Sequence, residues 1–243
     1  MKILFIRPII TNREDYLEED IIREFATPDT EIIARHLKFG PSSIENEYDL
    51  CHSAPFVVEQ AIKAEKDGFD GVISYCFANP GVDACREAIK IPVLGSGEAS
   101  LSIALAVGRR IGIVTILPNI LPLIRKQCAP YINIGKIVAV RSADIPVLSI
   151  NNNLDVILEK LYLEAKKCIT QNDADTIVLG CTGFAGFAKR IQHRLEKEGY
   201  FVPVLDPAAT SIRMMEALIA CNVTNNKITY MQPIEKEMKL PTK

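Results

Sequence analysis

Short apolar runs rich in β-branched residues alternate along this chain with longer stretches in which apolar positions recur at helical spacing. This alternation is typical of parallel strands that are joined by crossover helices. The predicted strands are residues 2–6, 30–37, 70–75, 91–95, 110–116, 136–141, 175–180 and 202–206. We therefore expect an α/β fold built from mostly parallel sheets with helices on their faces.

The helical stretches differ in how clearly their ends are marked. Residues 54–68 have a regular apolar spacing and close with Gly68, which we interpret as the C-cap. A long helix is predicted around residues 154–169, and a last helix covers about 208–220. The segment GSGEAS at 95–100 predicts a turn followed by a helix, because the acidic Glu98 favours a helix start.

The chain contains two copies of one strand and helix plan. Asp70 lies six residues before Cys76, and Asp175 lies six residues before Cys181. Each cysteine is followed by a helical stretch and then by a similar segment, which is IPVLGSGEAS at 91–100 and VPVLDPAATS at 202–211. We interpret this pattern as an internal duplication.

A duplicated α/β chain predicts two similar lobes that are related by a pseudo-twofold axis. We place residues 1–97 and 208–243 in the first lobe and residues 98–207 in the second, so that the last helix crosses back onto the first lobe. Ligands of open parallel sheets bind beyond the carboxyl ends of the strands, so we expect the active site in the cleft between the lobes. The polar segment from Asn222 onward predicts a surface appendage or partial disorder.

Composition narrows the class of protein. The 243 residues are 48% hydrophobic and 24% charged, with a formal net charge of -2, as in ordinary globular proteins. No basic stripe favours nucleic acid or an anionic membrane as a partner. The apolar runs are shorter than the roughly 18 residues that span a bilayer, and the N-terminus lacks a signal-peptide pattern. We expect a cytoplasmic homo-oligomer that binds a small-molecule substrate.

Seven cysteines without C-x-x-C spacing argue against a disulfide framework and against a zinc site. The histidines at 36, 52 and 193 do not cluster with other ligand residues in the sequence, so we expect no metal. Most of the cysteines are predicted to be packing residues, because free cysteine is usually buried as a small hydrophobe. These are Cys85, Cys128, Cys168 and Cys221.

Cys76 and Cys181 are different because they end equivalent strands, and the predicted axis brings them face to face. The small residues that follow each cysteine leave room for backbone N–H groups, and a helix begins nearby. Both features lower a thiol pKa from its reference of about 8.5. Two proton-exchanging groups on opposite faces of a ligand are what inversion at a carbon acid requires. Backbone amides would stabilise the charge on the adjacent carbonyl oxygen, so we expect no cofactor.

Several segments resemble the aspartate/glutamate/hydantoin racemase superfamily, and within it the hydantoin racemase family, which includes allantoin racemases. These segments are CFANPGVDACRE at 76–87, IPVLGSGEAS at 91–100, IGIVTIL at 111–117, VRSADIPVL at 140–148 and IVLGCTGF at 177–184. The resemblance implies that Cys76 and Cys181 are the catalytic pair. It also implies that the substrate contacts Pro8, Phe77, Ala78, Asn79, Thr115, Thr182 and Gly183.

Three places depart from the family pattern. The turn after the first strand is Arg7-Pro8-Ile9-Ile10, Asn79 stands where an acidic residue is usual, and Asp206-Pro207 stands where glycine is usual. All three lie on loops that are predicted to face the cleft, where they would affect which substrate fits.

The favoured hypothesis is a cofactor-independent racemase of a 5-substituted hydantoin or a related cyclic ureide such as allantoin. The alternatives are an aspartate/glutamate-type amino-acid racemase, a lyase or isomerase of the same superfamily, and a non-catalytic binding protein. A free amino acid needs charged partners, whereas CFANPG at 76–81 supplies an aromatic ring and neutral amides. Lyase relatives use a single cysteine or a different partner, and inert thiols would indicate a binding protein.

Overall fold

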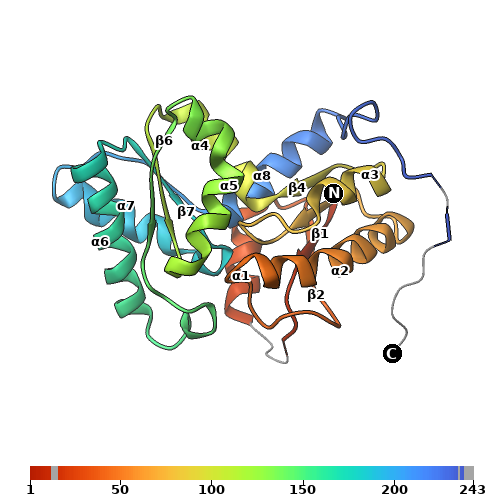
Figure 1. The fold of residues 1–243 in the computed structure, drawn as a ribbon, viewed down its shortest axis with the longest axis horizontal. Helices are drawn as coiled ribbons and strands as arrows, with labels where there is room; N and C mark the ends of the chain where they lie inside the picture. The colour runs from red at the N-terminus through yellow and green to blue at the C-terminus, as the bar shows by residue number, and fades with distance from the viewer. Residues whose placement is uncertain (12–15, 235, 238–243) are drawn as a thin grey trace.

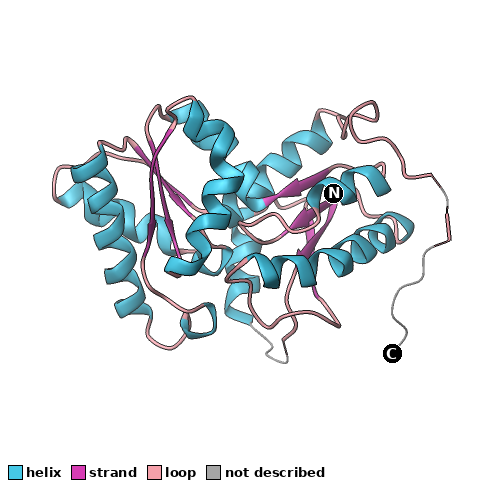
Figure 2. Cartoon of the chain, viewed as in Figure 1, coloured by secondary structure: helices cyan, strands magenta, loops and turns pink. Residues whose placement is uncertain are grey.

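The computed structural model describes residues 1–11, 16–234 and 236–237. Within these residues the strands form two parallel four-stranded sheets with helices packed around them (Figures 1 and 2). The first sheet has the order β2-β1-β3-β4 and the second β6-β5-β7-β8, so both follow the same plan. The predicted two-lobed α/β fold is confirmed.

The strands lie within two residues of their predicted ends. They are β1 (Lys2–Arg7), β2 (Glu31–His36), β3 (Gly71–Ser74), β4 (Val93–Gly95), β5 (Ile111–Thr115), β6 (Ile137–Ser142), β7 (Thr176–Leu179) and β8 (Val204–Leu205). The central strands β1, β3, β5 and β7 are buried at almost every residue, as the continuous apolar runs predict.

The helices are α1 (Tyr16–Phe25), α2 (Glu47–Lys66), α3 (Val82–Ala88), α4 (Ser96–Val107), α5 (Leu121–Asn133), α6 (Leu154–Asn172), α7 (Phe187–Lys197) and α8 (Pro207–Ala220). Helix α2 begins earlier than predicted, because the Asn46 side chain accepts a hydrogen bond from the Asp49 N–H and caps it. Its C-cap is Asp67, and Gly68 follows with a φ of +76°.

The duplicated aspartates, Asp70 and Asp175, make matching hydrogen bonds at the starts of β3 and β7. The Asp70 carboxylate accepts from the Lys2 N–H at 2.7 Å, and the Asp70 N–H donates to the Lys2 carbonyl at 2.8 Å. In the second sheet, Asp175 accepts from the Arg110 N–H at 3.0 Å and donates to the Arg110 carbonyl at 2.8 Å. Each aspartate therefore ties the third strand of its sheet to the first strand.

Helices α4 and α8 connect the two sheets by crossing between them. Helix α4 follows β4 of the first sheet and contacts β7 of the second, while α8 follows β8 of the second sheet and contacts β3 and β4 of the first. The two helices also contact each other at the centre of the molecule (Figure 1). Ala208, Ile212 and Met215 of α8 are buried in one cluster with residues of β1 and β3. The lobe limits at residues 97 and 207 remain a prediction.

The segment after α8 lies against the first lobe. The Asn225 side-chain oxygen accepts from the Val93 N–H at 2.9 Å, and Lys227 Nζ donates to the Ile89 carbonyl at 2.6 Å. Most of residues 222–230 are exposed, as expected of a surface appendage, but these hydrogen bonds hold the segment in place, so the alternative of partial disorder is wrong for it. Residues 235 and 238–243 of the same polar tail lie outside the described residues. No helix in the described part of the chain is long and apolar enough to cross a membrane.

The seven cysteines form no disulfide, and their environments range from buried to exposed. Cys85 in α3, Cys128 in α5 and Cys168 in α6 are fully buried, which confirms that they are packing residues. Cys221 at the end of α8 is exposed, so its interpretation as a packing residue is wrong.

Candidate active site

Cys76 and Cys181 occupy matching places, each just beyond the third strand of its sheet. Helices α3 and α7 begin six residues after the respective cysteine. Gly81 and Gly186 precede these helices with φ values of 70° and 85°, a left-handed conformation that favours glycine. Four residues separate cysteine from glycine in both copies of the sequence, and this shared spacing is the signal by which both turns could have been located.

The two cysteine-bearing strand ends meet across the lobes. The Tyr75 hydroxyl donates to the Thr182 carbonyl at 3.2 Å, and the Thr182 hydroxyl donates to the Tyr75 carbonyl at 3.4 Å. Tyr75 directly precedes Cys76, and Thr182 directly follows Cys181. With ordinary covalent geometry, these contacts keep the Cα atoms of the two cysteines within about 12 Å of each other.

Both thiols border the same apolar cluster and both residues are partly exposed. A Cβ atom on Gly183 would lie 2.7 Å from Ile150 Cδ1 and 3.6 Å from the Cys181 sulfur. Glycine therefore lets the backbone pass close to the Ile150 side chain, and the same position lies in ordinary contact distance of the Cys181 sulfur. Thr182 and Gly183 begin a short 3₁₀ helix (Thr182–Phe184), so their N–H groups have no partner within that helix. They are hydrogen-bond donors beside Cys181.

The expected lowering of the thiol pKa is wrong for Cys76. Burial raises its pKa to about 11, and the hydrogen bond from the Ala78 N–H lowers it by less. Helix α3 begins only at Val82, so a turn of five residues separates the thiol from the helix N-terminus. In the ligand-free protein Cys76 is therefore a neutral thiol at neutral pH.

Two of the predicted substrate-binding side chains are engaged by the protein itself. The Thr115 hydroxyl is fully buried and donates to the Gly180 carbonyl at 2.9 Å. The Asn79 side-chain oxygen accepts from the Gly97 N–H at 2.9 Å, and Asn79 has a φ of +52°. These contacts fix the end of β5 against β7, and they fix the Cys76 turn against the start of α4.

Three further residues that were predicted to contact the substrate are buried near the strand ends. Phe77 and Ala78 form the middle of the turn after Cys76, and their side chains lie in the large core cluster. Pro8 is buried directly after β1. Neighbouring Arg7, expected in the cleft-facing turn after the first strand, is instead the last residue of β1 and is buried, with its Nη1 atom 3.2 Å from His36 Nε2.

Asp206, a departure from the family pattern, has a clear structural role. One carboxylate oxygen accepts from the Ala208 N–H at 2.9 Å and caps α8, and the other accepts from the Gly186 N–H at 2.7 Å. Asp206 therefore joins the start of α8 to the turn that follows Cys181. In the first lobe, Asn79 and Gly97 make the corresponding connection between the Cys76 turn and α4.

A pocket of about 300 Å³ lies beside the Cys76 turn. Phe77 and Asn79 of the turn line it together with residues of α3, α4 and α5, and neither catalytic candidate does. Across this region the Gln127 side chain of α5 donates to the Ala78 carbonyl, so the second lobe also contacts the turn. No group of three or more metal-type ligand residues occurs within the described ranges.

Comparisons with known proteins agree with this arrangement. A family model described as Asp/Glu/Hydantoin racemase matches residues 17–215. The chain is similar to a hydantoin racemase of Pseudomonas sp. (strain NS671), with 32% identity over 238 residues that cover 98% of this chain and 94% of the relative. Its structure is similar to an allantoin racemase from Klebsiella pneumoniae, with a TM-score of 0.90, 30% identity, and coverage of 98% of this chain and 96% of that one.

An allantoin racemase structure from Pseudomonas fluorescens gives the same TM-score of 0.90 at 27% identity, and the match covers 98% of this chain and 100% of that one. Sequence and structure thus agree over nearly the whole length of the chain. The chain belongs to the Asp/Glu/hydantoin racemase family and is an isomerase of the racemase type.

Proposed function

We propose that this chain is a cofactor-independent racemase of a 5-substituted hydantoin or a related cyclic ureide such as allantoin, with Cys76 and Cys181 as its two bases. The observation that carries the proposal is the reciprocal pair of hydrogen bonds between Tyr75 and Thr182, which joins the two cysteine-bearing strand ends. The relatives named hydantoin racemase and allantoin racemase support the substrate class.

In the proposed reaction, a thiolate on one face of the ring removes the proton from C5, and the electron pair moves onto the adjacent carbonyl oxygen. The thiol on the opposite face then gives its proton to C5, and the carbonyl re-forms. The product leaves with inverted configuration, and the two sulfurs have exchanged thiol and thiolate. The N–H groups of Thr182 and Gly183 are the donors that would stabilise the negative oxygen.

The two thiols begin the reaction in different states under this proposal. Burial raises the pKa of Cys76 to about 11, so Cys76 starts as the proton donor. When Cys76 donates, Cys181 must act as the thiolate that removes the proton from the opposite face, and in the reverse direction the two sulfurs exchange these roles.

The charge around the thiols supports a neutral ring as the substrate. The turns at 76–81 and 181–186 contain no charged residue. A free amino acid would place a carboxylate and an ammonium group beside them, and both charges need partners. Of the predicted contact residues, we propose that Phe77, Ala78, Thr182 and Gly183 meet the substrate through their backbone. We propose that Pro8, Asn79 and Thr115 shape the site around it.

The test is a chiral assay combined with mass spectrometry in heavy water, using single enantiomers of 5-substituted hydantoins, allantoin, aspartate and glutamate. We expect racemisation and deuterium uptake with a cyclic ureide. In Cys76→Ser and Cys181→Ser, racemisation should fall by several orders of magnitude, because a serine hydroxyl is a far weaker base. Each variant should still exchange the proton of one enantiomer, and that enantiomer should differ between the two variants.

Cys221→Ser is the matched control, because it changes an exposed thiol at the end of α8 and should keep full activity. Near-normal racemisation by either Cys76→Ser or Cys181→Ser would contradict the two-base mechanism, as would exchange of the same enantiomer by both. Turnover of aspartate or glutamate alone would favour the amino-acid racemase instead.

A further inference from the structure

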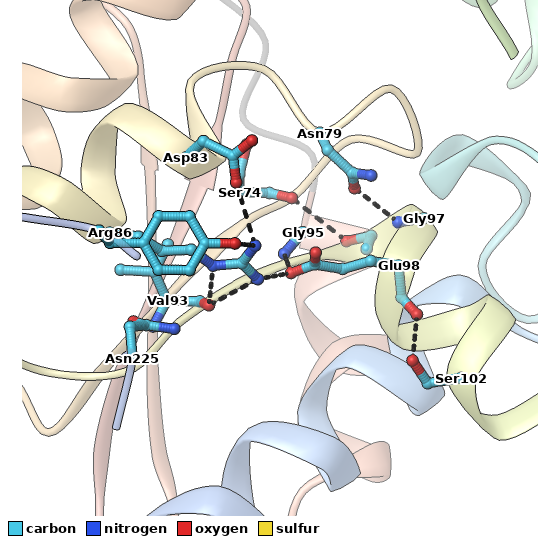
Figure 3. Close-up of polar contacts among 12 residues, drawn as sticks. Ser74, Asn79, Asp83, Arg86, Val93, Gly95, Gly97, Glu98, Ser102 and Asn225 are labelled. Carbon is cyan, nitrogen blue, oxygen red and sulfur yellow. Dashed lines mark hydrogen bonds and ion pairs between the residues drawn. The ribbon is translucent and has the colours of Figure 1, made fainter. Parts of the chain in front are cut away.

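The turn that carries Cys76 packs against residues 93–98, where β4 ends and α4 begins. We call this segment the β4–α4 corner. The Asn79 N–H donates to the Cys76 carbonyl at 3.0 Å. The Asn79 side chain accepts from the Gly97 N–H at 2.9 Å (Figure 3). A Cβ atom on Gly97 would lie 2.1 Å from the Phe77 carbonyl oxygen. Because this neighbour is backbone, only glycine fits here, and the backbone of the corner lies directly against the backbone of the turn.

Arg86 of α3 holds the same corner from the other side. Its Nη2 atom donates to the Val93 carbonyl at 3.3 Å and forms an ion pair with Glu98 (Figure 3). The Glu98 carboxylate also accepts from the Gly95 N–H at 2.9 Å, which closes the first turn of α4. The Arg86 side chain is only 11% exposed, so its ion pair is screened by water less than a surface pair is.

The C-terminal segment covers Arg86. The Tyr230 ring centroid lies 5.4 Å from Arg86 Cζ, and Arg86 Nη1 donates to the Tyr230 hydroxyl at 3.4 Å. Asn225 binds the Val93 N–H beside the carbonyl that Arg86 contacts (Figure 3). Lys227 fixes the segment by binding the Ile89 carbonyl at the end of α3. These contacts leave Arg86 little freedom to reorient.

We infer that Arg86 is a positioning residue for Cys76, and that residues 222–230 hold Arg86 in its working orientation. The physical connection runs from Tyr230 to Arg86, then through Glu98 and the β4–α4 corner to Asn79 and the cysteine turn. Losing the guanidinium would free Glu98 and loosen the corner, so the Cys76 turn would become more mobile. The effect on catalysis rests on the proposed function, whereas the effect on the thiol does not.

The second lobe offers a matched control. Arg194 of α7 also pairs with a carboxylate, Glu159, and lies over an aromatic ring, with its Cζ atom 3.9 Å from the Tyr162 centroid. Both partners belong to α6, so these contacts do not involve the turn that follows Cys181. Replacing Arg194 removes a comparable ion pair and ring contact without touching either cysteine turn.

The experiment compares Arg86→Gln, Arg86→Lys, Tyr230→Phe and Arg194→Gln in the full chain. The first readout is the rate at which iodoacetamide alkylates Cys76 and Cys181 in the folded, ligand-free protein, measured on separate peptides by mass spectrometry. In Arg86→Gln we expect Cys76 to react about tenfold faster, the size of one lost charge-assisted hydrogen bond, while the Cys181 rate stays unchanged. Tyr230→Phe should act in the same direction by about twofold, because it removes only the hydroxyl contact.

The second readout is proton exchange in heavy water with each enantiomer of a cyclic ureide. In Arg86→Gln we expect exchange through Cys76 to fall while exchange through Cys181 is kept, and Arg86→Lys should restore part of the loss. If wild-type protein exchanges no substrate, the proposed function fails, and the alkylation rates still test the role of Arg86.

Three outcomes would overturn the inference. Unchanged alkylation of Cys76 in a folded Arg86→Gln protein would show that the corner does not depend on Arg86. Equal acceleration at both cysteines would show general loosening, and an equal effect of Arg194→Gln on Cys76 would show that any lost ion pair suffices. If Arg86→Gln does not fold, then Arg86→Lys and Tyr230→Phe decide, and normal Cys76 reactivity in both would reject the inference.

Discussion

Two opposing influences set the protonation state of Cys76. Burial disfavours a thiolate, and the hydrogen bond from the Ala78 N–H favours one, but burial is the larger effect and raises the pKa to about 11. The neutral thiol is therefore the stable form across the physiological range. A group that begins protonated can deliver a proton directly, and it must first lose its own proton before it can remove one from the substrate.

This state predicts how Cys76 reacts as the pH changes. Because only the thiolate is alkylated, its rate with iodoacetamide should rise about tenfold per pH unit from pH 7 to 10 and level off only near pH 11. Peptide mapping after timed quenching measures the rate, with a short uncharged cysteine peptide as a reference that levels off near pH 9. A plateau for Cys76 below pH 9 in the ligand-free protein would contradict this pKa.

The sequence predicts that Cys76 and Cys181 follow equivalent strands, but it does not predict the hydrogen bonds that surround them. The six-residue spacing from aspartate to cysteine occurs twice within short segments, so it can be recognised from the sequence alone. By contrast, Asn79 binds a residue 18 positions away, and Thr115 binds one 65 positions away. Polar side chains that face a substrate and those that bind distant backbone look the same in sequence, so only the fold distinguishes them.

At the scale of elements, the crossing helices α4 and α8 each tie a cysteine turn to the opposite sheet. Asp206 makes this connection in the second lobe, because its carboxylate binds both the first turn of α8 and the turn after Cys181. Burial raises the pKa of Asp206, and the hydrogen bonds from three backbone N–H groups act against this rise.

We expect Asp206→Ala to lower the free energy of unfolding by about 3 kcal/mol, since it removes a helix N-cap and leaves the Gly186 N–H without its acceptor. Asp206→Asn keeps one acceptor oxygen and should cost about 1 kcal/mol. Urea unfolding followed by circular dichroism measures both values. Equal losses in the two variants would show that the acceptor oxygens are not the source of the stability.

Helix prediction failed where proline obscured the pattern. Helix α5 contains Pro122 near its start and Pro130 in its interior, so the apolar pattern does not predict a helix there. Proline is well tolerated in a first turn, which explains the earlier position but not the later one. Helix α2 likewise contains Pro55, and its true start depends on the Asn46 cap.

At the scale of the whole molecule, the duplication was predictable and the docking of the C-terminal segment was not. The two sheets share one strand order because the sequence repeats one plan. Residues 222–230 are polar and have no periodic pattern, yet Asn225 binds a backbone group 132 positions away. Homo-oligomer formation and a cytoplasmic location remain predictions.

The buried thiols in both lobes make overall stability sensitive to alkali. Cys85, Cys128 and Cys168 lie in α3, α5 and α6 with no exposed surface, and burial raises the pKa of each to about 12. An unfolded chain loses these protons from about pH 8.5 upward, whereas the folded chain keeps them. The folded state therefore binds more protons in this range, and its stability must fall as the pH rises.

Each thiol should lower the free energy of unfolding by about 1.4 kcal/mol per pH unit between roughly pH 9 and 12. Cys128→Ala removes one contribution, so its stability should fall less steeply with pH than that of the wild type, although it starts lower because a buried sulfur is lost. Cys51→Ala changes an exposed thiol and serves as the control. Urea titrations from pH 8 to 10.5 give the slopes. If Cys128→Ala and Cys51→Ala show the same slope as the wild type, the buried thiols do not cause the alkaline loss of stability.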